Sequence, residues 1–163
     1  MELRDALPED LPFLFQLYCD VRGPEVTAWG LQAGQVEIFL RMQFDAQRRS
    51  YEADFPEATH AIVVSGGRPI GRRLTARAAD GLHLVDIALL ASYRNQGLGT
   101  QLIRELMEQS RGAGCGLHLH VLRGNPAQRL YERLGFQQTA ADAMYIQMAW
   151  KPGSGTSGSE QVG

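Results

Sequence analysis

The sequence predicts a mixed α/β fold of the α+β kind, in which helices flank a central, mostly antiparallel sheet. Alternating apolar runs between residues 59 and 90 are joined by short turns, which is typical of an antiparallel meander. The run from Leu98 to Met107 repeats its apolar residues with a helical period. A further apolar run, Leu117 to Val121, follows that helix, so we expect a right-handed parallel crossover between the two strands that flank the helix.

Length and composition restrict the class of protein. The 163 residues, 44% of them hydrophobic, suffice for one domain with a sizeable core, which we expect over residues 1–150 and followed by a disordered Gly/Ser-rich tail over 151–163. A net charge of −2 gives no electrostatic reason to expect nucleic acid or a membrane as partner. Cys19 and Cys115 lie far apart without metal-ligand spacing, so neither a disulfide scaffold nor a bound metal is expected. The polar N-terminus and the lack of a long apolar run favour a cytoplasmic protein.

The N-terminal part should contain one short strand and two helices. We expect a strand at Glu2–Arg4 and a helix over Asp5–Tyr18 that ends at Arg22-Gly23-Pro24. An irregular stretch, Glu25–Gly34, reads as a loop near a pocket. A second helix is predicted over Gln35–Glu52. Its polar side is expected to be solvated, with the alternative that part of it lines an acceptor site.

The C-terminal part alternates predicted strands with two helices. Three glycines between Arg111 and Gly116 could form a phosphate loop, but their place after a helix favours a C-terminal cap. Asn125 suits an N-cap with Pro126 at the first helical position, and Gly135 suits the end of that helix. The predicted strands of the chain after residue 58 are 59–64, 69–78, 82–90, 117–121, 136–139 and 144–150.

A glycine-containing turn between a strand and a helix is the first functional signal. The segment runs from Arg94 to Thr100 and contains Gly97 and Gly99. Free N–H groups and the positive end of the helix dipole converge at such a turn, so it suits phosphate oxygens. A Walker A loop is excluded because Thr100 stands where a Lys is needed, and a dinucleotide fingerprint is excluded because Leu102 stands in place of a third small residue.

A second motif follows about thirty residues later and contains the pattern Asn125-x-Ala127-x-x-Leu130-Tyr131-x-x-x-Gly135-Phe136. Together with the Arg-x-x-Gly-x-Gly turn, it resembles the signature segments of the GNAT N-acetyltransferases. The resemblance spans about Leu3 to Trp150 and implies the GNAT acyl-CoA N-acyltransferase fold. In that fold the sheet splays between the strands 82–90 and 117–121.

The resemblance implies acetyl-CoA as cosubstrate. The pantetheine arm would pair with backbone groups at the end of the 82–90 strand. The turn would hold the pyrophosphate, and Asn125 would lie beside the arm. The residues that the resemblance assigns to the cosubstrate are Ala88, Leu89, Leu90, Arg94, Asn95, Gln96, Gly97, Leu98, Gly99, Thr100, Asn125, Ala127 and Tyr131. Many relatives carry proline where Ala91 stands, so the turn should be less rigid here.

The implied chemistry is direct attack of an amine on the thioester carbonyl, without a covalent enzyme intermediate. By resemblance, Tyr131 is the general acid that protonates the departing thiolate; its alternative role is an aromatic residue of the apolar stripe. Three residues are candidates for the base: Asp86, Glu25 and His120. Asp86 could equally be structural, because Arg72 is its diagonal neighbour if the turn sets the register, and His120 could simply be hydrogen-bonded in place.

The predicted function is transfer of an acetyl group from acetyl-CoA to a primary amine of a small molecule or of a peptide or protein N-terminus. The alternative is a catalytically silent acyl-CoA-binding sensor or assembly protein. If Glu25 and Asp86 both face the cleft, a cationic amine is favoured. The resemblance also allows a homodimer.

Overall fold

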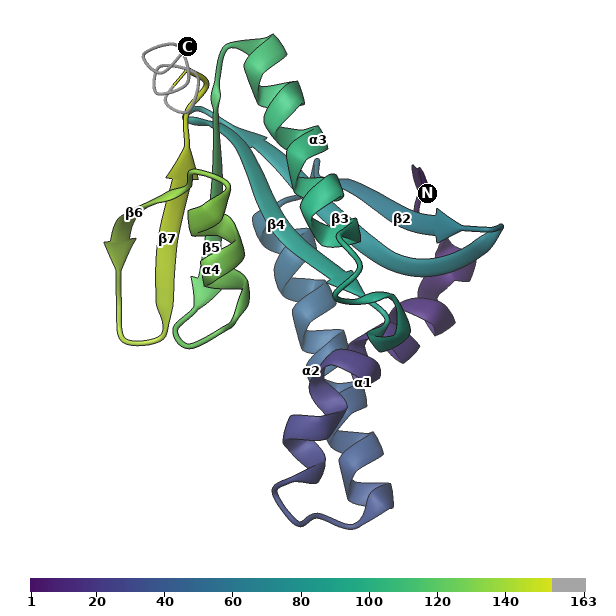
Figure 1. Cartoon of the computed structure of the whole chain (residues 1–163). Coiled ribbons are helices and arrows are strands. Elements are labelled where there is room, and N and C mark those ends of the chain that lie inside the picture. The colour runs from purple at the N-terminus through teal and green to yellow at the C-terminus, as the bar shows by residue number, and fades with distance from the viewer. Residues whose placement is uncertain (154–163) are drawn as a thin grey trace. The chain divides into compact units, whose positions relative to one another are not determined.

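The structure is a computed structural model that describes residues 1–153, so most of the expected tail lies outside the described residues. Within these described residues, four helices and seven strands form a mixed α/β arrangement, which confirms the predicted fold class (Figure 1). In chain order the elements are β1 (Glu2–Asp5), the 3-10 turn η1 (Pro8–Asp10), α1 (Leu11–Thr27), α2 (Ala33–Asp54), β2 (Thr59–Ser65), β3 (Arg68–Ala78), β4 (Gly81–Leu89), the 3-10 turn η2 (Ala91–Tyr93), α3 (Leu98–Ala113), β5 (Gly116–Leu122), α4 (Ala127–Arg133), β6 (Gln137–Ala141) and β7 (Tyr145–Trp150).

The chain forms two compact units. The first comprises Met1–Leu74 and Asp86–Gln96, and the second comprises Thr75–Val85 and the chain from Gly97 onward. The β3–β4 hairpin contributes to both, and the strand order of the sheet is β1-β2-β3-β4-β5-β7-β6. The single domain expected over residues 1–150 stays a prediction. Within residues 1–153, none of the helices is both long enough and apolar enough to cross a lipid bilayer.

In the first unit, α1 and α2 lie side by side and cover a short antiparallel sheet (Figure 1). Their shared core is built from Leu14, Phe44 and Ile62, all buried. The Phe15 ring packs on the Phe44 ring with centroids 5.3 Å apart. The periodic apolar residues of both helices therefore meet the inward face of β2, as the sequence pattern predicts.

Helix α1 differs from the sequence-based expectation at both ends. It starts at Leu11, after η1, and it continues through Arg22-Gly23-Pro24, where we had expected it to stop. Proline lacks an N–H, but the Pro24 carbonyl still accepts the Ala28 N–H at 3.1 Å. Val26, in the last turn, is completely buried. Tertiary burial of that turn offsets the local disadvantage of Gly23 and Pro24, so the expected loop from residue 25 begins only after Thr27.

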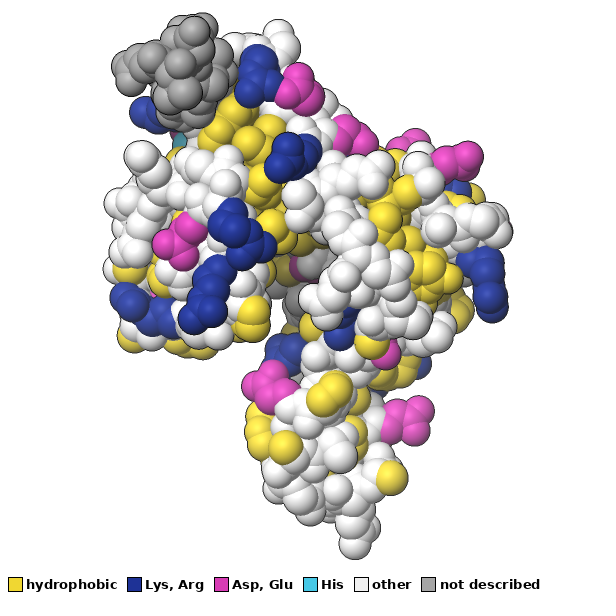
Figure 2. Space-filling view, viewed as in Figure 1, with side chains coloured by type: hydrophobic (Ala, Val, Ile, Leu, Met, Phe, Trp, Pro, Cys, Tyr) yellow, Lys and Arg dark blue, Asp and Glu magenta, His cyan; other side chains and the backbone are white. Residues whose placement is uncertain are grey.

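Apolar side chains stay exposed at the end of the helix pair where α1 leads into α2 (Figure 2). They include Trp29, Ile38 and Met42. The Trp29 ring meets the Phe39 ring edge-on, with centroids 5.3 Å apart. This surface belongs to the Glu25–Glu52 region, and it gives that region an apolar as well as a polar face.

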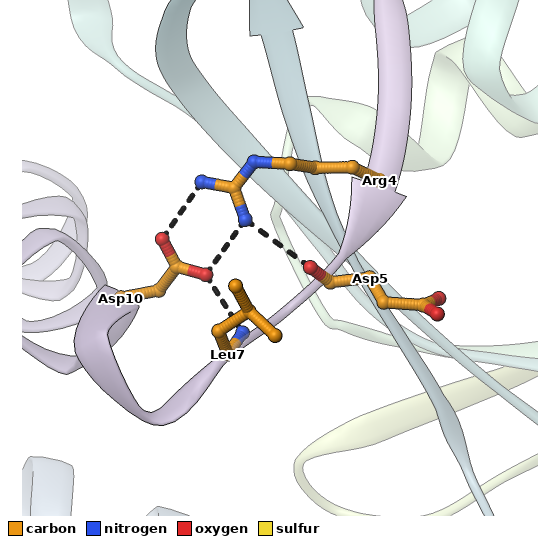
Figure 3. A network of polar contacts seen from close by, with 4 residues as sticks. All are labelled: Arg4, Asp5, Leu7 and Asp10. Carbon is orange, nitrogen blue, oxygen red and sulfur yellow. Dashed lines mark hydrogen bonds and ion pairs between the residues drawn. The ribbon is translucent and has the colours of Figure 1, made fainter.

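A charged cluster fixes the entrance to α1 (Figure 3). Arg4 donates two hydrogen bonds of 2.8 Å to the buried carboxylate of Asp10, and the Leu7 N–H donates a third of 2.7 Å. The hydrogen bonds from Arg4 lower the pKa of Asp10 to about 2, against the opposing effect of its burial. The ionised carboxylate thus ties β1 to η1.

We expect Asp10→Asn to lower the free energy of unfolding by about 1–3 kcal/mol at neutral pH, because it removes a charge-assisted pair and keeps one acceptor for Leu7. The folded-state pKa of Asp10 lies below its unfolded value, so its contribution is present above about pH 4 and is lost as the pH falls toward 2. Urea unfolding at several pH values should show the difference between wild type and variant shrinking over this range. A difference independent of pH would contradict the assignment.

The second unit holds the parallel crossover. Gly81–Leu84 of β4 pair in parallel with Gly116–Leu119 of β5, and α3 connects the two strands, as predicted. Strand β5 pairs along its length with β7, and β7 pairs with β6, both antiparallel. Gly114 adopts a left-handed conformation (φ 67°) and caps α3. The glycines after α3 therefore form a helix end, which confirms the capping interpretation.

Candidate functional site

The segment after β4 forms the predicted strand–turn–helix. Strand β4 ends at Leu89, η2 follows, and α3 begins at Leu98. Asn95 and Gly97 have left-handed backbones, with φ of 60° and 82°. The helical ladder of α3 starts with the Gln101 N–H donating to the Gly97 carbonyl at 3.0 Å. The N–H groups of the first turn, which precede this bond, have no intrahelical acceptor and lie at the positive end of the helix dipole.

Arg94 is held inside the first unit by two contacts. Its Nε donates to the Leu89 carbonyl at 2.8 Å, and its Nη2 lies 3.2 Å from Oδ2 of Asp20 in α1. The same Asp20 oxygen accepts the Ala91 N–H at 2.6 Å. A proline at position 91 would restrict the backbone through its ring, but it would have no N–H to donate. In this chain, the hydrogen bond from the Ala91 N–H to Asp20 restricts the turn instead. Asp20 therefore braces the turn.

Asp86 forms the ion pair that the hairpin register predicts. Arg72 donates from Nε to Asp86 Oδ2 at 2.9 Å and from Nη2 to the same oxygen, while Nη2 also reaches Gln47 Oε1 at 3.1 Å. The Arg72 side chain is 8% exposed and that of Asp86 25%. Both bonds use Oδ2, and no hydrogen bond from the described residues reaches Oδ1. Within the described residues, the two hydrogen bonds from Arg72 to Asp86 therefore end on a single carboxylate oxygen.

Tyr18 lies near both carboxylates proposed as bases. Burial raises the pKa of the Tyr18 hydroxyl; Arg22 lowers it, and Cys19, Glu25 and Asp86 raise it. Glu25 itself pairs with Arg22 at 3.3 Å on the exposed side of α1. The charges of Glu25 and Asp86 therefore both favour the neutral form of the Tyr18 phenol.

A cavity of about 540 Å³ lies on this side of the first unit, between η1, the helices and strands β2 and β3. Its lining includes Tyr51, His60 and Arg72 among apolar residues. Burial lowers the pKa of His60, and the charge of Arg72 lowers it further. The cavity therefore contains a neutral imidazole and shares Arg72 with the Asp86 ion pair.

The second motif is organised around α4 in the second unit. Asn125 Oδ1 accepts the Ala127 N–H at 2.9 Å, although the helix starts at Ala127, one residue later than expected. Tyr131 is buried, with its ring 5.7 Å from that of Phe136. The chain turns back after α4, and the Phe136 N–H donates to the Tyr131 carbonyl at 3.0 Å. Gly135 permits this turn because its φ is 100°. Gly135 and Phe136 therefore hold Tyr131 in place.

The predicted site residues divide between the two units. Residues 86–96, with Glu25, belong to the first, and Gly97–Thr100, Asn125, Ala127, Tyr131 and His120 belong to the second. His120 is exposed on β5, opposite Gln147 of β7. Sequence reasoning missed Asp20 and Tyr18, and it placed Gln47 only on the polar side of the second helix, as a possible part of an acceptor site. The hydrogen bonds of Asp20 join α1 to the turn after β4, and that of Gln47 joins α2 to β3; no local spacing signals such pairs.

Comparison with known proteins identifies the family and the fold. The model of the acetyltransferase (GNAT) family matches residues 28–136. Among solved structures, the PaiA N-acetyltransferase of Thermoplasma acidophilum in complex with coenzyme A has a TM-score of 0.70 at 18% identity, covering 92% of this chain and 98% of its own. The ribosomal-protein-S18-alanine N-acetyltransferase of Escherichia coli has a TM-score of 0.59 at 20% identity, covering 92% of each chain. These two show the shared fold.

A curated relative is similar over a shorter segment. The glucosamine 6-phosphate N-acetyltransferase 1 of Oryza sativa subsp. japonica is 33% identical over 58 residues, which are 36% of this chain and 35% of that protein. The family match covers most of the described chain and both motifs. This chain belongs to the GNAT acetyltransferase family.

Proposed function

We propose that this protein transfers an acetyl group from acetyl-CoA directly to a primary amine, carried by a small molecule or by a peptide or protein N-terminus. The observation that carries the proposal is the turn at the entrance of α3, where Gly97 is left-handed and the first-turn N–H groups precede the helical ladder. In this proposal, residues 94–100 bind the diphosphate of CoA, and backbone groups at 88–90 hold its pantetheine arm.

Negative charge develops on two atoms of the thioester during amine attack, and we propose a protein group that stabilises the charge on the sulfur. Negative charge builds first on the thioester oxygen and then on the leaving sulfur. Tyr131 protonates the sulfur, and the packing around its ring holds it in one position. The attacking ammonium must lose a proton, and Asp86 Oδ1 is the acceptor that we favour, with Glu25 as the second candidate.

The acceptor is proposed to be a cationic amine. Asp86 and Glu25 supply negative charge near the Tyr18 hydroxyl, and the nearby α1–α2 connection exposes apolar side chains such as Trp29. Relatives differ in their named acceptors: one is named for glucosamine 6-phosphate and one for an alanine of a ribosomal protein. Incubation with acetyl-CoA and a panel of amines, followed by measurement of free thiol, tests the proposal. CoA binding without thiol release for any amine would instead favour a silent acyl-CoA binder.

Gly99→Ala should weaken CoA binding about tenfold or more without destabilising the protein. A Cβ at Gly99 meets no atom of the protein within 4 Å and Gly99 has no positive φ, so the substitution strains nothing. Its methyl group would obstruct only a ligand that approaches the backbone. Titration calorimetry with CoA measures the loss.

The matched control is Gly112→Ala, near the other end of α3, where a Cβ also meets nothing within 4 Å. It should bind CoA as the wild type does, and both variants should keep or slightly raise the melting temperature, since alanine favours the helix. Equal CoA affinity in the two variants would remove the support for a diphosphate at this turn.

A further inference from the structure

Two histidines stand side by side at the start of the parallel strand pair in the second unit. His83 of β4 and His118 of β5 are direct register partners, so their side chains share one face of the sheet. Their rings are stacked, with centroids 4.9 Å apart and an interplanar angle of 23°. The side chains are 22% and 23% exposed, so ions in solution can reach them.

Glycines bring the two strands into close contact at this place. A Cβ on Gly81, whose φ is 133°, would lie 2.5 Å from the Gly116 carbonyl oxygen, so position 81 excludes a side chain. A Cβ on Gly116 would lie 3.2 Å from His118 Nε2. The His118 ring therefore lies close to the backbone of Gly116, which carries no side chain. Its Nε2 points to the β3–β4 turn.

Asp80, in that turn, completes a cluster of three residues whose side chains can bind a metal ion. Its Oδ1 lies 2.7 Å from His83 Nε2, and its Oδ2 lies 3.8 Å from His118 Nε2. His118 Nε2 also lies 2.9 Å from the Asp80 carbonyl oxygen. One donor atom from each of the three residues falls within 4.8 Å of the others. In the described chain this is the group of histidine, cysteine and acidic residues that could hold a metal ion.

We infer that Asp80, His83 and His118 form a binding site for a divalent transition metal ion, best matched by Zn²⁺. Two imidazole nitrogens and one carboxylate oxygen are ligands that Zn²⁺ takes at about 2.0–2.2 Å, with water as a fourth ligand. The ion would take the place of the proton that links His83 to Asp80. Small rotations of the three side chains would suffice, because the donor atoms already converge.

Such an ion would act as a structural staple. It would join the β3–β4 turn to the first residues of β5, and all three ligands belong to the second unit. The cluster contains none of the residues proposed for acetyl transfer. The sequence-based expectation that no metal is bound rested on cysteine spacing, and the two histidines come together only through the parallel pairing.

The test is a Zn²⁺ titration of the full chain after treatment with a chelator. We expect one ion per chain by calorimetry. The melting temperature should rise by roughly 5 to 10 °C when free Zn²⁺ exceeds its dissociation constant about 100-fold. Co²⁺ offers an independent readout, because its visible absorption strengthens in a four-coordinate site of nitrogen and oxygen ligands.

The decisive variants are His83→Gln and His118→Gln, with His120→Gln as the matched control on the exposed side of β5. The first two should each lower the Zn²⁺ affinity at least about tenfold and abolish the Co²⁺ spectrum, since each removes one of three protein ligands. The control should bind both ions as the wild type does. Circular dichroism of the metal-free variants checks that they fold. An unchanged Zn²⁺ shift in the double variant H83Q/H118Q would overturn the inference, as would its loss in His120→Gln alone.

Discussion

Tyr131→Phe is expected to lower kcat for acetyl transfer by about 100-fold or more, with little change in KM for acetyl-CoA. The variant keeps the buried ring and its packing on Phe136 and removes only the hydroxyl. General acid catalysis acts on the leaving thiolate and is realised in the transition state, so the loss should appear in kcat. Steady-state kinetics with free-thiol detection measures it.

The control for this experiment is Tyr145→Phe in β7 of the same unit, where the tyrosine is 40% exposed. It should retain wild-type kcat. If Tyr131→Phe keeps full kcat, Tyr131 is an aromatic residue of the apolar stripe and the proton comes from elsewhere.

Asp86→Leu is expected to lower the free energy of unfolding by about 3 kcal/mol, because it leaves the buried Arg72 guanidinium without its carboxylate. The double variant R72M/D86L should recover much of that stability, since replacing both charges by apolar groups of similar volume is often neutral. Denaturant unfolding of the wild type, Arg72→Met, Asp86→Leu and the double variant completes a double-mutant cycle. Asp45→Asn is the control: its exposed pair with Arg48 on α2 should be worth less than about 1 kcal/mol.

Activity of the double variant separates the two roles of Asp86. If Asp86 serves only to satisfy Arg72, the stable double variant should regain acetyl transfer together with its fold. If Asp86 Oδ1 takes the proton of the amine, R72M/D86L should be folded and yet remain at least about 100-fold slower in kcat/KM. We expect the second result, because both hydrogen bonds from Arg72 go to Oδ2.

Local sequence patterns accounted for most elements of the fold. The meander, the helix after it and the parallel strand that follows were all predicted, since alternation, helical period and turn glycines act over a few residues. The end of α1 was wrong because it depends on burial of Val26, which outweighs Gly23 and Pro24. Helix propensities of the local sequence contain no information about that burial.

The candidate site was predictable only in part, for the same reason. The turn at Gly97 and the motif around Tyr131 each consist of residues that are close in sequence, so their local structure could be predicted. Asp20, which accepts hydrogen bonds from Ala91 and Arg94, belongs to a helix about seventy residues earlier. The spacing of residues in the sequence therefore could not predict this contact. Tyr18 is likewise near Asp86 only in the folded chain.

By itself, then, the sequence determined the family, the order of strands and helices, and the strand–turn–helix around Gly97, because each depends on residues that are neighbours along the chain. Tertiary structure decided what surrounds each charged group: Arg72 pairs with Asp86, Asp20 accepts the Ala91 N–H, and His83 lies beside His118. Those outcomes follow from strand register and helix packing, which bring distant residues within hydrogen-bonding range.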